Sequence, residues 1–146
     1  MNDVHIQLDA LTDAFFRAVS FRVGEKPEYN RIYDLFIDGG LLIKNSEETP
    51  QISTVGQFIA PRQLLVDSGE LVSFAEAEIA HQTEIFGRIA HRLRTYTKST
   101  VTTAGATEAR GVISTQFVEA ATGWRMSAMA WDDERPGLTI PNLRQV

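Results

Sequence analysis

The sequence predicts an α+β domain in which three N-terminal helices pack on a strongly curved antiparallel sheet. In the first half of the chain the apolar residues recur at helical spacing, and after Gly69 they alternate at every second position, as in strands. Helices that come first and hairpins that follow are typical of α+β proteins, because α/β proteins interleave the two. A strand longer than about ten residues has to bend, which favours a sheet that wraps around the helices.

The length and composition narrow the possibilities further. The 146 residues predict one domain, residues 1–146, of which residues 135–146 form a C-terminal arm. The absence of cysteine excludes a disulfide framework and a thiolate zinc site. Lys and Arg total 14 against 19 for Asp and Glu, a balance that argues against nucleic-acid binding. No apolar run approaches the roughly 20 residues of a membrane span and the polar start is unlike a signal peptide, so we expect a cytoplasmic protein.

Two helices are predicted before residue 38. Asp3 is the expected N-cap of the first, and Gly24 with Pro27 ends it near residue 23. Pro27 then opens a second, shorter helix. Their apolar stripes consist of Leu8, Leu11, Phe15, Ala18 and Val19 in the first helix, and of Tyr29, Ile32, Tyr33 and Phe36 in the second.

A short strand and a third helix follow. Asp38-Gly39-Gly40 interrupts the helical pattern, and the apolar residues 41–44 are predicted as a strand. Thr54 and Gln57 have the spacing of a capping box, so a helix should run from there to about residue 68. Pro61 lies inside it and predicts a kink or a split.

The remaining chain is predicted as strands. Residues 75–85 form a long strand whose core face is Ala75, Ala77, Ile79, His81, Thr83 and Ile85, and whose other face is acidic. Phe86-Gly87-Arg88 is expected as a three-residue turn, and the next strand begins near Ile89 with Ile89, His91 and Leu93 toward the core. Residues 111–120 and 124–132 form the last hairpin. Both of its faces are apolar, which predicts that one face packs on the helices and the other on a second subunit in a homodimer.

The order of these elements resembles the nuclear transport factor 2-like superfamily, also called SnoaL-like or cystatin-like. The likeness extends from about Asp9 to Pro141 and includes a bacterial group of unassigned function. It rests on Phe86-Gly87-Arg88-Ile89-Ala90-His91, Thr95-Tyr96, Arg110-Gly111, Gln116-Phe117, Trp124-Arg125-Met126 and Trp131-Asp132-Asp133-Glu134-Arg135-Pro136. The resemblance implies a cone-shaped cavity between sheet and helices, in which members that are isomerases or cyclases move protons with an Asp or a His.

His91 is the tentative catalytic residue, because it alternates with Ile89 and Leu93 on the predicted core face. A buried histidine satisfied by one partner is the alternative. His81 is expected on the same face of the neighbouring strand, as pocket lining. The two imidazoles lack a third ligand, so neither a metal site nor a cofactor is predicted.

Further pocket residues are expected from the second helix and the last hairpin. Tyr29 and Tyr33 lie one turn apart and could donate hydrogen bonds to a carbonyl or enolate; ordinary aromatic anchors are the alternative. Trp131 is a candidate for the cavity floor, with a core or dimer-interface role as the alternative, and Gln116 is expected as a polar pocket residue that orients a ligand. Cross-strand ion pairs with glutamates explain the alternation of Arg88, Arg92 and Arg94.

Two classes of function are consistent with this sequence. The first is a small-molecule binder with an apolar pocket, acting on a small hydrophobic ligand as a cofactor-free isomerase, cyclase or dehydratase through a pocket histidine. The second is a non-catalytic dimerisation or binding module whose cavity is filled by its own side chains, among them Phe15, Phe36, Phe58 and Trp131.

Overall fold

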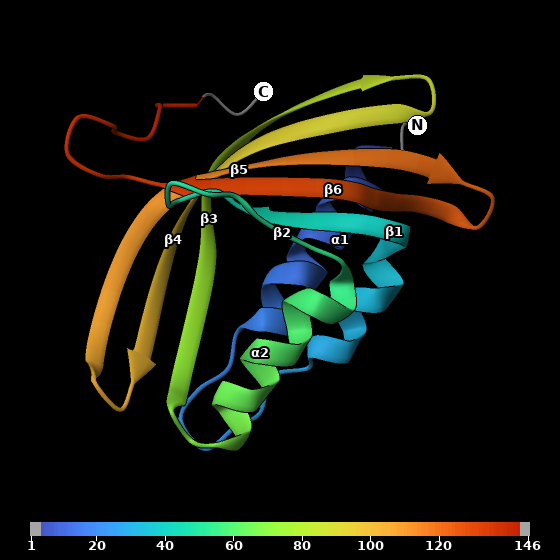
Figure 1. Ribbon diagram of the computed structural model, residues 1–146. Coiled ribbons are helices and arrows are strands. Elements are labelled where there is room, and N and C mark those ends of the chain that lie inside the picture. Colours follow the sequence, from blue (N-terminus) through green and yellow to red (C-terminus); the bar gives the residue numbers. More distant parts are fainter. Residues whose placement is uncertain (1–3, 144–146) are drawn as a thin grey trace.

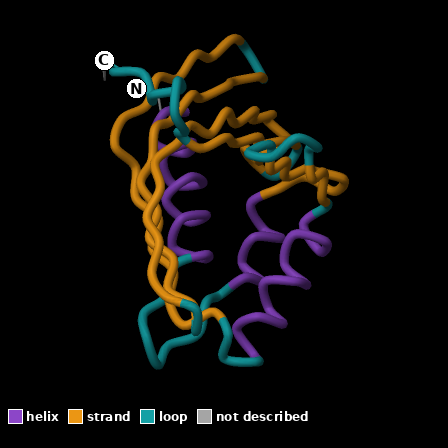
Figure 2. Tube along the Cα trace, turned by 60° about the vertical axis from the view of Figure 1, so that its left-hand side comes forward, coloured by secondary structure: helices purple, strands orange, loops and turns teal. Residues whose placement is uncertain are grey.

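Three helices lie on one side of a six-stranded sheet (Figures 1 and 2). The computed structural model describes residues 4–143, so the expected cap at Asp3 lies outside the described residues. The elements are α1 (Val4–Val19), the 3-10 helix η1 (Tyr29–Leu35), β1 (Phe36–Lys44), β2 (Gln51–Ser53), α2 (Val55–Asp67), β3 (Leu71–Phe86), β4 (Ile89–Thr102), β5 (Gly105–Ala120) and β6 (Gly123–Asp133).

The sheet is mixed, which corrects the expectation of an antiparallel one. Its strand order is β2-β1-β6-β5-β4-β3, and β1 runs parallel to β6 while every other neighbouring pair is antiparallel. The sequence pattern predicted only residues 41–44 of β1. The strand in fact begins at Phe36, directly after η1, and enters the sheet beside β6 in the same direction. The long strands β3, β4 and β5 change direction along their length, as Figure 1 shows.

The helices follow the sequence prediction in place and differ in detail. The capping box of α2 is confirmed: Gln57 N donates to Thr54 Oγ1 (3.2 Å), and Thr54 N donates to Gln57 Oε1 (2.9 Å). Pro61 lies within α2 without dividing it. The segment after Pro27 forms a 3-10 helix instead of an α-helix.

The β3–β4 turn sets the register of the adjoining parts of β3 and β4. It consists of Gly87 and Arg88 alone, since Phe86 pairs with Ile89, and Gly87 has a φ of 58°. A glycine at the first position is typical of two-residue type II′ turns. The predicted three-residue turn is therefore wrong by one residue, and a one-residue slip moves every side chain of a strand to the opposite face. The residues of β4 that face the helices are Ala90, Arg92, Arg94 and Tyr96, all buried.

A β-bulge changes the alternation in β3. Glu78 pairs with Tyr96 and Ala80 with Thr95, so one extra residue lies between them. Before the bulge, the even-numbered residues Glu76 and Glu78 face the helices. After it, odd-numbered residues such as Thr83 do. The predicted core face of β3 is thus correct only after the bulge, and Ile79 is largely exposed.

A second bulge accounts for the doubly apolar last hairpin. Phe117 pairs with Met126 and Gln116 with Ala128, which leaves Ser127 as the extra residue. Trp124 and Met126 before the bulge therefore join the same buried core as Met129 after it. The apolar pattern thus has an explanation within one chain, and the homodimer through the sheet face stays a prediction.

Residues 134–143 continue from the sheet as an arm without helix or long strand. Arg135 and Leu138 form an isolated bridge. Glu134 ties this segment to the sheet, because its side chain pairs with Arg110 (3.2 Å) and accepts a hydrogen bond from Ile140 N (2.8 Å). Residues 144–146 of the predicted arm lie outside the described residues.

Candidate functional site

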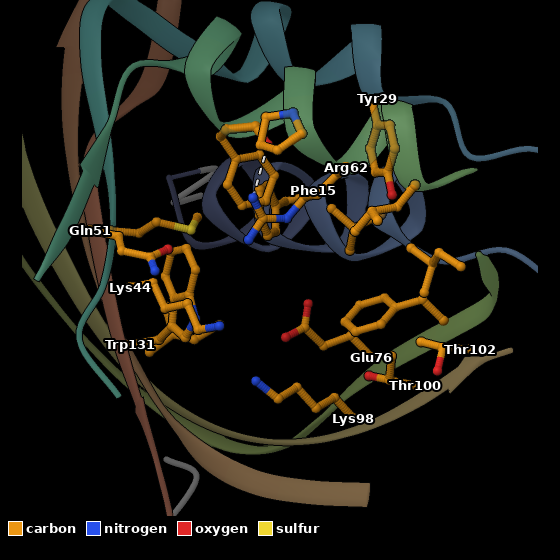
Figure 3. A pocket seen from close by; sticks show the side chains of 18 residues that line it. Phe15, Tyr29, Lys44, Gln51, Arg62, Glu76, Lys98, Thr100, Thr102 and Trp131 are labelled. Carbon is orange, nitrogen blue, oxygen red and sulfur yellow. Dashed lines mark hydrogen bonds between the residues drawn. The ribbon is translucent and has the colours of Figure 1, made fainter. Parts of the chain in front are cut away.

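A cavity of about 410 Å³ lies between the helices and the inner face of the sheet (Figure 3). This volume falls within the usual range for small-molecule sites. Its apolar lining comes from α1, η1, α2 and the strands β3, β5 and β6, and consists of Phe15, Val19, Tyr29, Phe58, Pro61, Leu65, Leu71, Phe74, Ile113, Met129 and Trp131. Phe58 packs edge-on against Trp131 and also contacts Phe15, so flat aromatic rings form one wall.

Charged side chains enter this apolar space from several elements. Glu76 of β3 and Lys98 of β4 are partners across the ladder, and both point into the cavity in Figure 3. Arg62 reaches in from α2 and Lys44 from the end of β1. Gln51, Thr100 and Thr102 supply the remaining polar lining.

The cavity raises the pKa of the Glu76 carboxyl to about 7. The main cause is burial, which penalises the ionised form. Lys98, Arg94 and Arg62 act in the opposite direction, and Asp133 adds to the rise. A carboxyl that gains and loses its proton near pH 7 is suited to general acid–base chemistry.

Lys98 is held by a hydrogen-bonded row across three strands. Its Nζ lies 3.0 Å from Asp133 Oδ2, and the hydroxyl of Tyr96 donates to Asp133 Oδ1. Tyr96 on β4 and Asp133 on β6 are both partners of Gly111 on β5. A Cβ at Gly111 would collide with the Tyr96 hydroxyl, so this glycine lets the tyrosine reach across β5 to Asp133.

Arg62 is fixed against the aromatic wall. Its Nη1 donates to Phe58 O (2.9 Å), and the guanidinium lies 3.7 Å from the centre of the Phe58 ring. Burial lowers the pKa of Arg62, and burial likewise raises the pKa of the Tyr29 hydroxyl. The Tyr29 ring is buried in the core and also lines the cavity.

Of the residues predicted from the sequence, Tyr29 and Trp131 line the cavity. Tyr33 is 53% exposed and is not part of the lining. Gln116 lies on the outer face, where it accepts a hydrogen bond from Ser127. His81 faces inward but lies beyond the cavity, with its Nδ1 2.9 Å from Glu78 Oε1.

The predicted orientation of His91 toward the cavity is wrong. Its side chain is 63% exposed and lies opposite Glu84, with Nε2 2.8 Å from Glu84 Oε1. The two-residue turn at Gly87 is the cause, because it places the odd-numbered residues at the start of β4 on the outer face. The acid–base role depends on the inward orientation and therefore loses its basis.

Glu76, Lys98 and Arg62 are the functional candidates that the sequence pattern missed. An unbroken alternation of β3 places Glu76 on the acidic outer face, and the bulge is what reverses this assignment. The Gly87-Arg88 pair was a usable signal for the end of β3, because a Gly-X turn pairs Phe86 with Ile89. Continued without a break, that register places Glu76 opposite Ser99, and the bulge shifts its partner to Lys98. Within residues 4–143, no cluster of three or more potential metal ligands occurs, and no helix is long and apolar enough to cross a membrane.

Comparison with solved structures identifies the fold. A nuclear transport factor 2-like superfamily protein from Salmonella enterica superposes with a TM-score of 0.73 at 12% identity, over 90% of this chain and 92% of that chain. A Caulobacter vibrioides protein with a cystatin-like fold gives 0.69 at 15% identity, over 93% of both chains. A Novosphingobium aromaticivorans protein provisionally named an aromatic ring hydroxylase gives 0.71 at 15% identity, over 92% and 91%.

The chain therefore has the nuclear transport factor 2-like, cystatin-like fold that the sequence motifs indicated. No family model matches the sequence, and no curated protein matches it. Identities this low show the fold alone, and one fold of this kind hosts many unrelated activities.

Proposed function

We propose that the protein binds a small, largely apolar carbonyl compound in this cavity and catalyses a cofactor-free proton shift within it, with Glu76 as the acid–base group. The observation that carries the proposal is the Glu76 carboxyl, which faces an apolar cavity and has a pKa of about 7. A side chain of that pKa has a large fraction of the base form and of the acid form at the same neutral pH.

The proposed reaction needs no external reactant. Ionised Glu76 removes a proton from the carbon that lies between the substrate carbonyl and a carbon–carbon double bond; the C–H bond breaks and its electron pair moves into a conjugated dienolate. The carboxylic acid so formed returns the proton to the far carbon of that double bond, the carbonyl is restored and the double bond has moved next to it. Glu76 ends in its starting state, so protons and electrons balance.

The surrounding cations support such a step. Negative charge accumulates on the enolate oxygen, and a preorganised positive group in a water-poor site stabilises it far better than in water. Lys98 and Arg62 reach the cavity from opposite walls, and each is fixed by another contact, Lys98 by Asp133 and Arg62 by the Phe58 carbonyl. Fixed groups of this kind need little rearrangement when the charge develops.

The unfilled volume favours a ligand site over a structural module. Phe15, Phe58 and Trp131 were candidates for plugging the cavity, but they line its wall and leave about 410 Å³ open. Phe36 is buried in the core and is absent from the lining. A purely structural domain would gain stability by filling such a space, because each unfilled methyl-sized volume costs about 1 kcal/mol.

Deuterium exchange tests the proposal with a panel of compounds, so the natural substrate need not be identified first. Apolar ketones and unsaturated acids are incubated with the protein in buffered D2O, and deuterium incorporation next to the carbonyl is followed by NMR. We expect Glu76→Gln to slow the incorporation by at least about 100-fold, the usual contribution of a positioned acid–base group. Glu84→Gln, on the exposed outer face of the same strand, is the matched control and should exchange like the wild type.

The dependence on pH completes the test. The exchange rate of the wild type should rise as pH passes through about 7, where Glu76 becomes ionised. Equal loss of activity in Glu76→Gln and Glu84→Gln would contradict the acid–base role. Binding without any exchange in the wild type would leave a binding domain and overturn the catalytic part of the proposal.

A further inference from the structure

We infer that the ligand of this cavity carries a carboxylate or an equivalent single negative charge, held by Lys44 and Lys98 beside the aromatic wall, and that the rest of the ligand is flat and apolar. This inference deepens the proposed function and rests on it for the identity of the site. It adds to the proposed function the class of molecule that the cavity selects.

The first argument is the distribution of charge. Two of the three lysines in the chain, Lys44 and Lys98, line the cavity together with Arg62. In Figure 3 the charged ends of these three cations lie on the same side of the cavity as Trp131, whereas Tyr29, Thr100 and Thr102 lie on the other side. A ligand would therefore be oriented, with its charged end toward the cations and its remainder along the apolar lining.

The second argument is that these cations are not fully compensated. Within residues 4–143, the one ion pair of Lys44 is loose, at 4.0 Å from the exposed Glu47. Arg62 makes its hydrogen bond to a neutral carbonyl, and burial lowers its pKa, as expected for a cation short of counter-charge. Lys98 is paired with Asp133, but its ammonium carries three donors. Glu76 is partly neutral near pH 7 and supplies only part of the missing negative charge.

The third argument concerns shape. Phe58 and Trp131 meet edge-on, with ring centres 6.1 Å apart, and Phe15 lies 6.2 Å from Phe58. Aromatic side chains stack on or pack edge-on against flat, unsaturated groups. A ligand with a flat apolar body and one anionic end matches both the wall and the cations, whereas a sugar or a multiply phosphorylated nucleotide would need many more polar partners.

Such a ligand would be coupled to the proton on Glu76. Lys98 and Arg94 from β4, Arg62 from α2 and Asp133 from β6 are the charged groups that act on this carboxyl. An anion bound beside the lysines raises the pKa of Glu76 further, so the protein must take up a fraction of a proton when it binds the anion at pH 7.5. A neutral ligand of the same shape desolvates Glu76 but adds no negative charge, so it should cause a smaller uptake.

A pair of isosteric probes tests the inference directly. Binding of 2-naphthoate and of the neutral 2-naphthamide is measured by isothermal titration calorimetry at pH 7.5, in two buffers of different ionisation enthalpy. We expect naphthoate to bind at least tenfold more tightly than naphthamide, with proton uptake that Glu76→Gln abolishes. Lys44→Gln should reduce this preference severalfold, and Lys26→Gln, an exposed lysine outside the cavity, should leave it unchanged.

The outcomes separate this inference from the proposed function. Naphthamide binding as tightly as naphthoate, or no binding of naphthoate at all, overturns the inference of an anionic ligand even if deuterium exchange depends on Glu76. Anion preference without any exchange supports the inference and removes only the catalytic role. Lys44 is part-exposed at the end of a strand, so Lys44→Gln tests the inference with little risk to folding.

Discussion

Two groups of charged side chains occupy the inner face of β3 and β4, and they differ in what surrounds them. The packed cluster, under α1, consists of Asp9, Glu78, His81, Arg92 and Arg94. The open cluster, in the cavity, consists of Lys44, Arg62, Glu76 and Lys98. Glu76 and Glu78 face the same side of the same strand, yet one belongs to each cluster.

In the packed cluster the charges are matched within the chain. Arg92 is 1% exposed; it pairs with Asp9 (2.6 Å) and donates to Thr83 (2.7 Å) and Thr12 (3.1 Å). Arg94 is 2% exposed, lies 2.9 Å from Glu78 and stacks over Phe16. Its Nη2 nevertheless has no hydrogen-bond partner among the described residues.

The comparison separates structural from functional buried charge. Each cluster contains a group whose pKa is shifted by burial, Arg94 in the packed cluster and Glu76 in the open one, so a shifted pKa alone does not distinguish the clusters. The free volume beside the charges does distinguish the two clusters. Helix α1 covers the packed cluster, whereas the open cluster borders the cavity of about 410 Å³. Charges that are buried, incompletely paired and next to an unfilled cavity are those to which a ligand can add a missing partner.

The largest expected effect comes from breaking the packed cluster with Glu78→Gln. The amide keeps the shape of the carboxylate but removes the charge that balances Arg94, a guanidinium with almost no access to water. Leaving one partner of a buried pair uncompensated costs about 3–5 kcal/mol. Urea unfolding at pH 7.5 should show a loss of about that size, and a loss below about 1 kcal/mol would contradict the assignment of Glu78 as structural.

Glu76→Gln, in the open cluster, should have the opposite effect and increase the free energy of unfolding above pH 7. Because the folded state raises the pKa of Glu76 from 4.5 to about 7, the unfolded chain loses this proton first as pH rises, and stability falls between pH 4.5 and 7. Above pH 7 the cost amounts to about 3 kcal/mol. Glu76→Gln should therefore be more stable than the wild type at pH 8 and nearly equal to it at pH 4.5.

Urea unfolding of the wild type and of Glu76→Gln at pH 4.5 and pH 8 measures this difference in stability. A wild type whose stability relative to Glu76→Gln does not change with pH would mean that Lys98 and Arg62 fully compensate the ionised carboxylate. The open cluster would then be as well paired as the packed one, and the contrast between them would disappear.

An intermediate effect is expected for Tyr96→Phe, which loosens the support of the open cluster. The fully buried hydroxyl donates to Asp133, which in turn pairs with Lys98. Its removal should cost about 1.5–3 kcal/mol in urea unfolding, the usual value for a buried hydrogen bond to a charged group. A neutral result would show that Asp133 is satisfied by Lys98 alone.

The smallest effect is expected on the outer face. His91 and Glu84 form an exposed pair, so His91→Gln should change stability by less than about 0.5 kcal/mol and leave 2-naphthoate binding unaltered. Loss of ligand binding in this variant would place the histidine near the cavity in solution and contradict its outward orientation.

Several parts of the fold were predictable because they depend on local chemistry. The capping box at Thr54 is a contact between neighbours in sequence, and the first helix is specified by its apolar stripe. The change from helices to hairpins identified the α+β class. Each of these signals lies within about ten residues of chain and is independent of distant partners.

The orientation of the strand faces was less predictable, because hydrophobicity alone assigned the wrong face of β4 to the core. Ile89 and Leu93 suggested one core face for β4, but the structure buries Arg92 and Arg94 instead, and long-range partners stabilise them. Asp9 lies 83 residues away from Arg92 in sequence. No local pattern predicts that an arginine will find a carboxylate on a helix so distant, and the candidate site was displaced by the same error.

The bulges at Ile79 and Ser127 also affect how this sequence should be aligned with its structural relatives. Near Ile79 and Ser127 one strand holds a residue that its neighbour does not match, so a relative with a regular ladder there needs a one-residue gap. An ungapped alignment at 12% identity would then pair inward positions with outward ones over half a strand. A search for equivalents of Glu76 should therefore start from superposed backbones and place its gaps at the bulges.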